Sequence, residues 1–208
     1  MSQILADDSP TFKDTILLGK YCIAILCIGH GHRPAVPTNM TIQQYDIGQT
    51  IDEMRVVYVR HHKVGTTQPA AVCLSMEEVK YFQKYREAIA QHRPDFVDTT
   101  PEERQKLTFF YLHSTRSRKQ KDVDEEEEDD EKKYDHNVNN HIRRLHEMFN
   151  KQLERKGRAP LKLITSSMTR KAIENDARRG YGASEHAQER RAISNYIVHT
   201  VGVADQHY

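Results

Sequence analysis

An acidic run limits what this chain of 208 residues can fold into. Nine of the ten residues from Asp122 to Glu131 are Asp or Glu. A block of like charges resists burial, so we expect a solvated, disordered loop at about residues 116–136. A packed domain must therefore be built from the chain on either side of this loop.

The acidic run also masks the charge of the remaining chain. The formal net charge is +1, and leaving out the nine acidic residues of the run raises it to +10. A basic surplus of this size is typical of a surface that follows phosphates. The adjoining segment 116–121 is rich in Arg and Lys, so the run either neutralises it when DNA is absent or is a tolerated surface insertion.

Hydrophobic periodicity predicts several helices. Apolar residues at helical spacing (Ile16, Leu17, Tyr21, Ile25) predict a buried first helix over Asp14–Leu26. A capping box of Ser75 and Glu78 begins a second helix that reaches about Gln91. The clearest amphipathic helix runs from Asn137 to Lys156, with Val138, Ile142, Leu145, Phe149 and Leu153 on one face. Two more helices are expected. One is capped by Ser166, carries Arg170 in its first turn and ends near Arg178, and the other spans Glu185–His199.

Three segments have the composition of strands. They are Arg55–Arg60, Ala70–Leu74 and Lys106–His113, with a turn near Gly65 between the first two. The predicted fold class is α+β, a mainly helical domain with a small three-stranded antiparallel sheet at one edge. Residues 1–14 are expected to be an extension and residues 15–208 one domain.

Cysteine usage and hydropathy indicate the compartment. Cys22, Cys27 and Cys73 fit reduced thiols better than a disulfide framework. No leader segment is recognisable, and no apolar run reaches about 18 residues, the length that spans a membrane. These features predict a soluble, intracellular protein with no membrane partner.

Five polar residues, in the order Arg33, Lys63, Arg170, His199 and Tyr208, suit the cleavage of a phosphodiester. Its pentacoordinate transition state gathers negative charge on the non-bridging oxygens, and two guanidinium groups can each bind two of them. A phenol in a positive pocket can act as the nucleophile, and an imidazole adds a hydrogen bond. A lysine whose pKa is lowered by nearby arginines can protonate the leaving oxygen.

The segments around these residues resemble the catalytic domain of tyrosine recombinases, the phage-integrase family. The likeness is greatest to divergent recombinase-like reading frames of animal mobile elements, and it runs from about Thr15 to Tyr208. Gly31-His-Arg-Pro-Ala resembles the segment of the first arginine, and Val56–Gly65 resembles the hairpin that presents the lysine. Ser166-Ser-Met-Thr-Arg-Lys-Ala-Ile aligns with the His-x-x-Arg box, and His199 precedes Tyr208 at the spacing of the family.

The resemblance implies roles for these residues. Tyr208 would attack the scissile phosphate to give a 3′-phosphotyrosyl intermediate while Arg33 and Arg170 hold its oxygens. His199 would donate a hydrogen bond, and Lys63 would protonate the departing 5′ oxygen. The partner would be double-stranded DNA, which implies the nucleus, and the complete protein would be a homo-oligomer on DNA. No metal or cofactor is implied.

Two departures from the family pattern keep a second interpretation open. Ser167 stands three residues before Arg170, where most members carry a histidine. Its hydroxyl can contact a phosphate but cannot relay a proton near neutral pH. The sequence also ends at Tyr208, where family members usually continue. The alternative is a catalytically inactive DNA-binding or chromatin-associated module derived from such a recombinase.

Other functions predict different features. An interaction scaffold without a nucleic acid partner predicts that carboxylates of the fold itself fill the arginine pocket. The pairs His30-Gly-His32 and His61-His62 raise the question of a metal, but no CxxC or HExxH pattern accompanies them. No glycine-rich nucleotide-binding loop is present in the sequence.

Overall fold

The computed structural model describes residues 2–60, 69–111, 137–180, 188–189 and 192–193. Its helices are α1 (Ser2–Ala6), α2 (Phe12–Ala24), the π-helix η1 (Ile25–Gly29), α3 (Ala35–Asn39), α4 (Ile42–Asp46), α5 (Met76–His92), the 3₁₀-helix η2 (Pro94–Phe96), α6 (Pro101–Lys106), α7 (Val138–Arg155) and α8 (Ser166–Gly180). Its strands are β1 (Gln49–Ile51), β2 (Met54–Val59) and β3 (Ala70–Ser75). The predicted class, a mainly helical α+β fold with a small antiparallel sheet, is confirmed.

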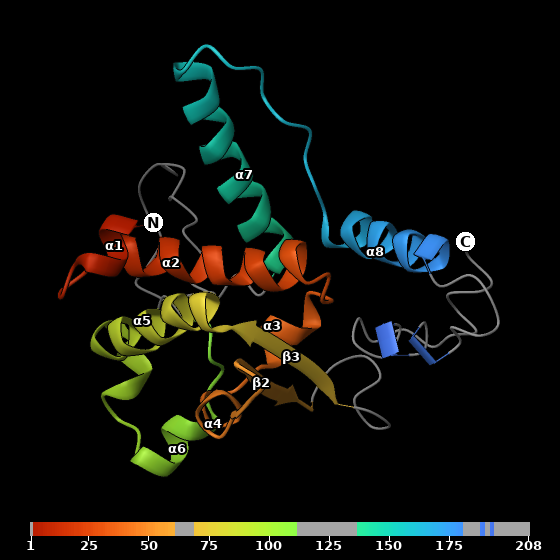
Figure 1. Cartoon of the computed structure of the whole chain (residues 1–208). Coiled ribbons are helices and arrows are strands. Elements are labelled where there is room, and N and C mark those ends of the chain that lie inside the picture. The colour runs from red at the N-terminus through yellow and green to blue at the C-terminus, as the bar shows by residue number, and fades with distance from the viewer. Residues whose placement is uncertain (1, 61–68, 112–136, 181–187, 190–191, 194–208) are drawn as a thin grey trace, which may run out of the picture.

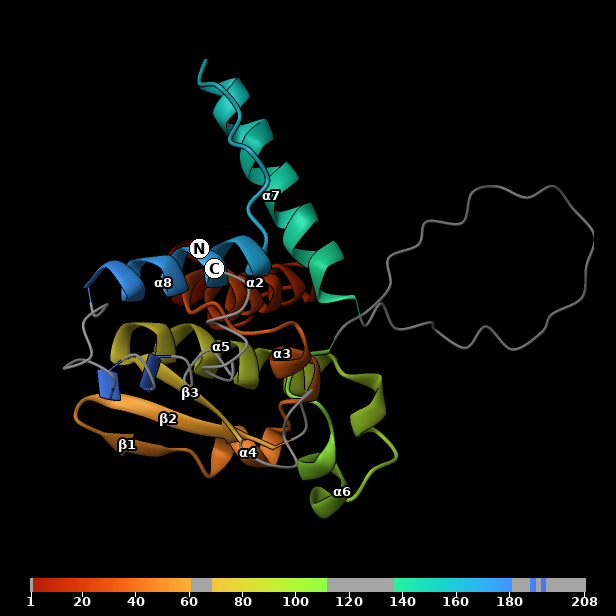
Figure 2. The ribbon, with the colours of Figure 1, turned by 90° about the vertical axis from the view of Figure 1, so that its right-hand side faces the viewer.

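Helix α5 is the centre of the fold. It lies between the sheet on one side and α2 on the other, while α7 projects away from the body and α8 lies beside the end of α2 (Figure 1, Figure 2). The capping box predicted at Ser75 is present, because Ser75 accepts from the backbone N–H of Glu78 and Glu78 accepts in return. The core between these layers is apolar and aromatic, and it includes Leu18, Cys22, Leu26, Val57, Leu74, Phe82, Tyr85, Phe109 and Phe110.

The prediction of a strand over Lys106–His113 is wrong for the residues that the structure describes. Helix α6 continues to Lys106, and the following residues form only an isolated bridge between Thr41 and Thr108. Phe109, Phe110 and Tyr111 are all buried, whereas a strand would send alternate side chains to opposite faces. The buried Arg93, which forms an ion pair with Asp95, also donates to the carbonyl of Thr108 and holds this irregular segment on the core.

The third strand is instead β1, which the sequence analysis missed. The sheet order is β1-β2-β3, and Ile51 pairs with Met54 across a two-residue turn. Asp52 and Glu53 form the turn with φ of 46° and 61°. Positive φ at both positions is the geometry of a type I′ hairpin turn, which usually carries Asn-Gly. With three exposed residues and an Asp-Glu turn, β1 lacks the usual signs of a strand.

The apolar faces predicted for two helices are only partly correct. In α2, Ile16, Leu17 and Tyr21 are half-buried, and the face on the core is formed by Leu18 and Cys22. In α7, Val138 and Ile142 are buried, but Leu145 and Leu153 are half-buried and Phe149 is 47% exposed. Both helices therefore carry apolar surface that the core does not cover.

Two further expectations concern compartment and membrane. Cys22, Cys27 and Cys73 are free cysteines. Across the described ranges, we find no helix with the length and apolar character needed to cross a membrane. Of the predicted helix Glu185–His199, only residues 188–189 and 192–193 are described, and they are helical.

The turn between β1 and β2 gives a test of the sheet. Replacing Asp52 by Asn and Glu53 by Gly should stabilise the protein by about 0.5–1 kcal/mol, because these residues adopt positive φ at lower cost. The midpoint of urea unfolding should rise. Asp98→Asn, an exposed acid outside the sheet, serves as the control for charge removal. A midpoint at or below that of the unchanged protein would contradict the assigned turn.

Candidate functional site

The loop that carries Arg33 is fixed by hydrogen bonds to the end of the first long helix. After α2 the chain widens into the π-helix η1, and π-helical turns occur often at functional sites. The N–H of His30 donates to the carbonyl of Ile25 at 2.9 Å, and the N–H of His32 donates to that of Leu26 at 2.9 Å. Between these histidines Gly31 adopts φ of +71°, which turns the chain toward Arg33.

Helix α8 packs directly on this loop. A Cβ placed on Gly31 would lie 2.8 Å from Cδ1 of Ile173 and 3.4 Å from Cγ of Arg170. The guanidinium of Arg170 donates to the carbonyl of His32 at 3.5 Å, a long hydrogen bond. The structure thus brings Arg170 to the residue before Arg33, although 137 positions separate the two arginines in the sequence.

Arg33 is half-buried at the start of α3. Its backbone carbonyl accepts from Val36 at 2.8 Å, which begins the turn into the helix. The Nε atom of its side chain is buried and has no hydrogen-bond partner, and no carboxylate among the described residues forms an ion pair with it. If the chain were only an interaction scaffold, a carboxylate of its own fold would be expected to pair with Arg33. No such carboxylate is found in the described parts of the chain.

Arg170 lies deeper, with 9% of its surface exposed. It is the fifth residue of α8 and belongs to the second helical turn, so its predicted place in the first turn is wrong. The predicted cap Ser166 is also wrong, because the hydroxyl of Thr165 accepts from the N–H of Met168. Burial raises the pKa of the nearby Cys27 thiol to about 12, and the charge of Arg170 offsets part of this rise.

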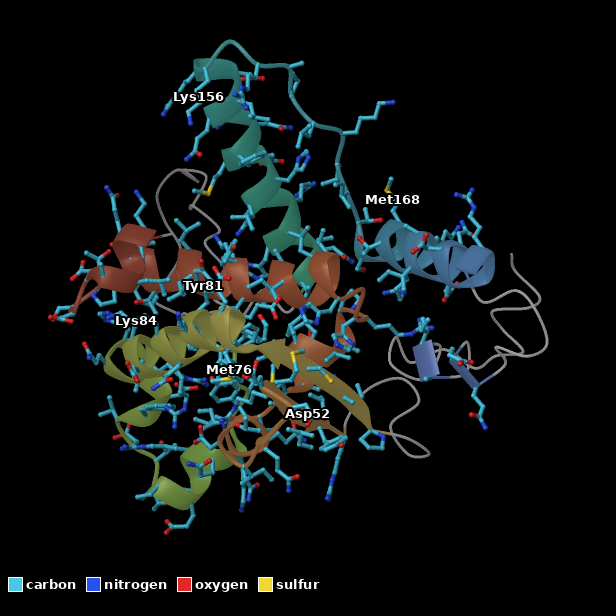
Figure 3. All side chains as sticks on the ribbon, in the orientation of Figure 1. Asp52, Met76, Tyr81, Lys84, Lys156 and Met168 are labelled. Atoms are coloured by element: carbon cyan, nitrogen blue, oxygen red, sulfur yellow. The ribbon has the colours of Figure 1, made fainter. Side chains whose placement is uncertain are left out.

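Ser167 lies on the outer side of this helix. It is exposed, as is Met168, which Figure 3 shows on the side of α8 that faces away from the body. Arg170, by contrast, faces the loop of Gly31 and His32. Ser167 therefore stands at the helix surface, and the side chain of Arg170 reaches into the protein.

A histidine and carboxylate group supports the loop, and the sequence analysis missed it. His30 lies 2.8 Å from Oε1 of Glu78, and its ring stacks on that of the fully buried His32 with centroids 6.2 Å apart. Glu78 was recognised only as part of the capping box at Ser75. Burial raises the pKa of Glu78, but the hydrogen bonds from His30 and Ser75 outweigh it, so the pKa is lowered. The loop of Arg33 is thereby tied to α5 as well as to α8.

Three of the predicted site residues, Lys63, His199 and Tyr208, lie outside the described residues. In the sequence, Lys63 falls between Val59 and Ala70, which pair with each other where β2 ends and β3 begins. In the residues that are described, we find no cluster of three or more His, Cys, Asp or Glu side chains arranged to hold a metal ion.

Comparison with known proteins finds no family model, no curated protein and no solved structure that matches this chain.

Gly31 gives the first test of this site. Gly31→Ala should destabilise the protein by roughly 1–3 kcal/mol for the unfavourable φ, with a further cost for the contact with Ile173. Gly157→Ala is a matched control, since Gly157 has φ of +67° and nothing within 4 Å of an added Cβ. Urea unfolding of both variants measures the difference. Equal losses of stability would show that α8 does not lie against the loop.

Glu78 gives a second test, through pH. The pKa of Glu78 is near its ordinary value of 4.5 in the unfolded chain and is lower in the folded protein, so its stabilising effect is present above about pH 4.5 and is lost as the pH falls through the folded pKa. The stability difference between the unchanged protein and Glu78→Gln should shrink as the pH falls below 4.5.

The control for this measurement is Glu103→Gln. Glu103 forms the same kind of capping box with Thr100 but is exposed, and no contact with a histidine is among those described for it. At pH 7 the loss of unfolding free energy should be smaller for Glu103→Gln than for Glu78→Gln. Equal losses would mean that the contact with His30 adds nothing to the cap.

Proposed function

We propose that this chain is a catalytic domain of the tyrosine-recombinase type, which cuts and rejoins double-stranded DNA through a 3′-phosphotyrosyl intermediate. The observation that carries the proposal is the meeting of two predicted arginine segments. Helix α8 directs Arg170 at the carbonyl of His32, and the next residue, Arg33, has no described carboxylate partner. Two guanidinium groups carried by segments that pack together suit an anion such as a phosphodiester.

Each residue has a defined part in the proposed reaction. The phenol of Tyr208 releases its proton to solvent, its oxygen forms a bond to phosphorus, and the bond from phosphorus to the 5′ oxygen breaks. Lys63 gives a proton to the leaving oxygen, while Arg33 and Arg170 stabilise the charge on the non-bridging oxygens. His199 adds one more hydrogen bond. Because the phosphotyrosyl ester keeps the bond energy, rejoining to another strand needs no ATP.

The architecture supports this proposal at a coarser level. The domain is mainly helical, its sheet is small and antiparallel, and Lys63 falls in the connection between two paired strands. A lysine on such a connection can reach a groove of DNA while the arginines contact the backbone.

A second candidate is an inactive DNA-binding module, and two observations favour it. Ser167, where the family usually has a histidine, is exposed on α8. Arg170 is largely buried and donates to a backbone carbonyl, as an arginine with a purely structural role would. Both candidates predict DNA binding that weakens with salt, so affinity does not separate them.

Covalent trapping on a nicked suicide substrate separates the two candidates. The unchanged chain should form a denaturation-resistant adduct with DNA, and Tyr208→Phe should form none while binding DNA nearly as well. Arg33→Ala should reduce the rate of adduct formation by about 10²–10³-fold, because it removes a charged donor from the transition state. Tyr58→Phe, an exposed tyrosine on β2, is the control for loss of a phenol.

The outcomes of this experiment differ clearly. An adduct that is equal in the unchanged chain and in Tyr208→Phe would remove the proposed nucleophile. No adduct with any chain, together with salt-dependent DNA binding that Arg33→Ala weakens, would establish the second candidate. An absence of DNA binding at low salt would exclude both.

A further inference from the structure

An open apolar groove of about 500 Å³ lies on the face of the protein next to α7. Its floor comes from the outer face of α2 and η1, one wall from α7, and the other wall from Leu161 and Ile164 of the segment 158–165, which leads to α8. Its apolar lining includes Leu17, Tyr21, Ile28, Leu145, Phe149 and Ile164. The groove is separate from the loop of Arg33.

Large apolar side chains are exposed along the groove. Met148, Phe149, Leu161 and Ile164 are 43–52% exposed. Helix α7 contacts the body through its first turns and then projects outward, with Lys156 at its far tip (Figure 1, Figure 3). Contiguous exposed apolar side chains of this kind are typical of a surface that binds another protein.

The far wall of the groove is held in place by side-chain hydrogen bonds. Asn150 donates to the carbonyl of Leu161 at 3.0 Å and accepts from its N–H at 2.9 Å. His146 contacts the carbonyl of Lys162 at 3.0 Å. These bonds fix the segment 158–165 against α7, so the groove is formed before any partner binds, which lowers the entropic cost of binding.

The charges around the groove are mostly positive. Residues 138–164 contain seven Arg or Lys and two Glu. By helical spacing, Arg144, Lys151 and Arg155 follow the edge of α7 next to Met148, while Glu147 and Glu154 lie toward the opposite side. Burial lowers the pKa of Lys20 on α2, and the nearby Arg144 lowers it further. The surplus of Arg and Lys along this part of the chain favours an acidic partner.

We propose that this groove binds an amphipathic helix of a partner protein, with its apolar face in the groove and acidic residues along its edges. The groove follows α7 from Ile142 to Gln152, about 15 Å at 1.5 Å per residue, which matches about three turns of a bound helix. The apolar lining disfavours nucleic acid as the occupant. A second copy would place one basic α7 beside another, which like-charge repulsion opposes.

The test is an unbiased selection. A display library of random peptides of about 20 residues, long enough to contain the three helical turns of the groove with flanking residues on both sides, is selected on the whole chain. The enriched peptides should carry apolar residues at helical spacing flanked by Asp or Glu. Their affinity for Phe149→Ser should fall by roughly tenfold or more, the loss expected for an aromatic anchor. Val97→Ser, an exposed apolar residue outside the groove, should leave the affinity unchanged.

Several results would overturn the proposal. One is a selection that yields no enriched peptide, and another is enrichment of basic or uncharged helices. Equal binding to Phe149→Ser and to the unchanged chain would place the peptides elsewhere. A dimer detected by sedimentation and abolished by Phe149→Ser would identify a second copy as the occupant. Loss of peptide binding when duplex DNA is added would identify nucleic acid as the occupant. None of these measurements depends on strand cleavage.

Discussion

The fold depends on the close approach of α2 to α5. A Cβ on Gly19 would lie 2.6 Å from Cε2 of Tyr85, so the two helices can pack this closely only because residue 19 has no side chain. Tyr85 is fully buried, and its hydroxyl accepts from the backbone N–H of Tyr111 at 2.8 Å. This one ring therefore joins α2, α5 and the aromatic segment that follows α6, where it lies at a tilt against Phe109 and Phe110 with ring centroids 5.6 and 5.5 Å away.

The direction of α2 in turn sets the candidate site. Its continuation as η1 widens the helix just before His30, and the bonds from His30 and His32 back to η1 leave Gly31 to make the turn. Because Gly31 has no side chain, Ile173 and Arg170 of α8 pack directly against the backbone of this turn. A helix from the C-terminal part of the chain is thus fixed against the N-terminal part, on the far side of the acidic run in sequence.

Capping boxes and apolar spacing in the sequence predicted the helices whose ends and faces they determine. The cap at Ser75 and the apolar spacing after Asn137 gave α5 and α7 nearly to the residue. The sequence could not reveal β1, since its turn positions hold Asp and Glu where Asn and Gly are usual. Three consecutive aromatic residues at Phe109–Tyr111 suggested a strand, yet tertiary packing buries all three from an irregular backbone. At the site, the pairing of His30 with Glu78 spans 48 positions, and no local pattern indicates it.

The burial of Arg170 is compatible with a structural role and with a catalytic one, for a physical reason. A guanidinium has five donor N–H groups in a rigid plane, so a bond to the carbonyl of His32 fixes the orientation of the whole group. A donor that is already oriented in a site with little water loses no energy to reorganisation when charge develops nearby. The hydrogen bond from Arg170 to His32 therefore anchors α8 on the loop and would also keep a cationic group oriented beside Arg33. A protein without catalytic activity could keep the same bond for its structural role alone.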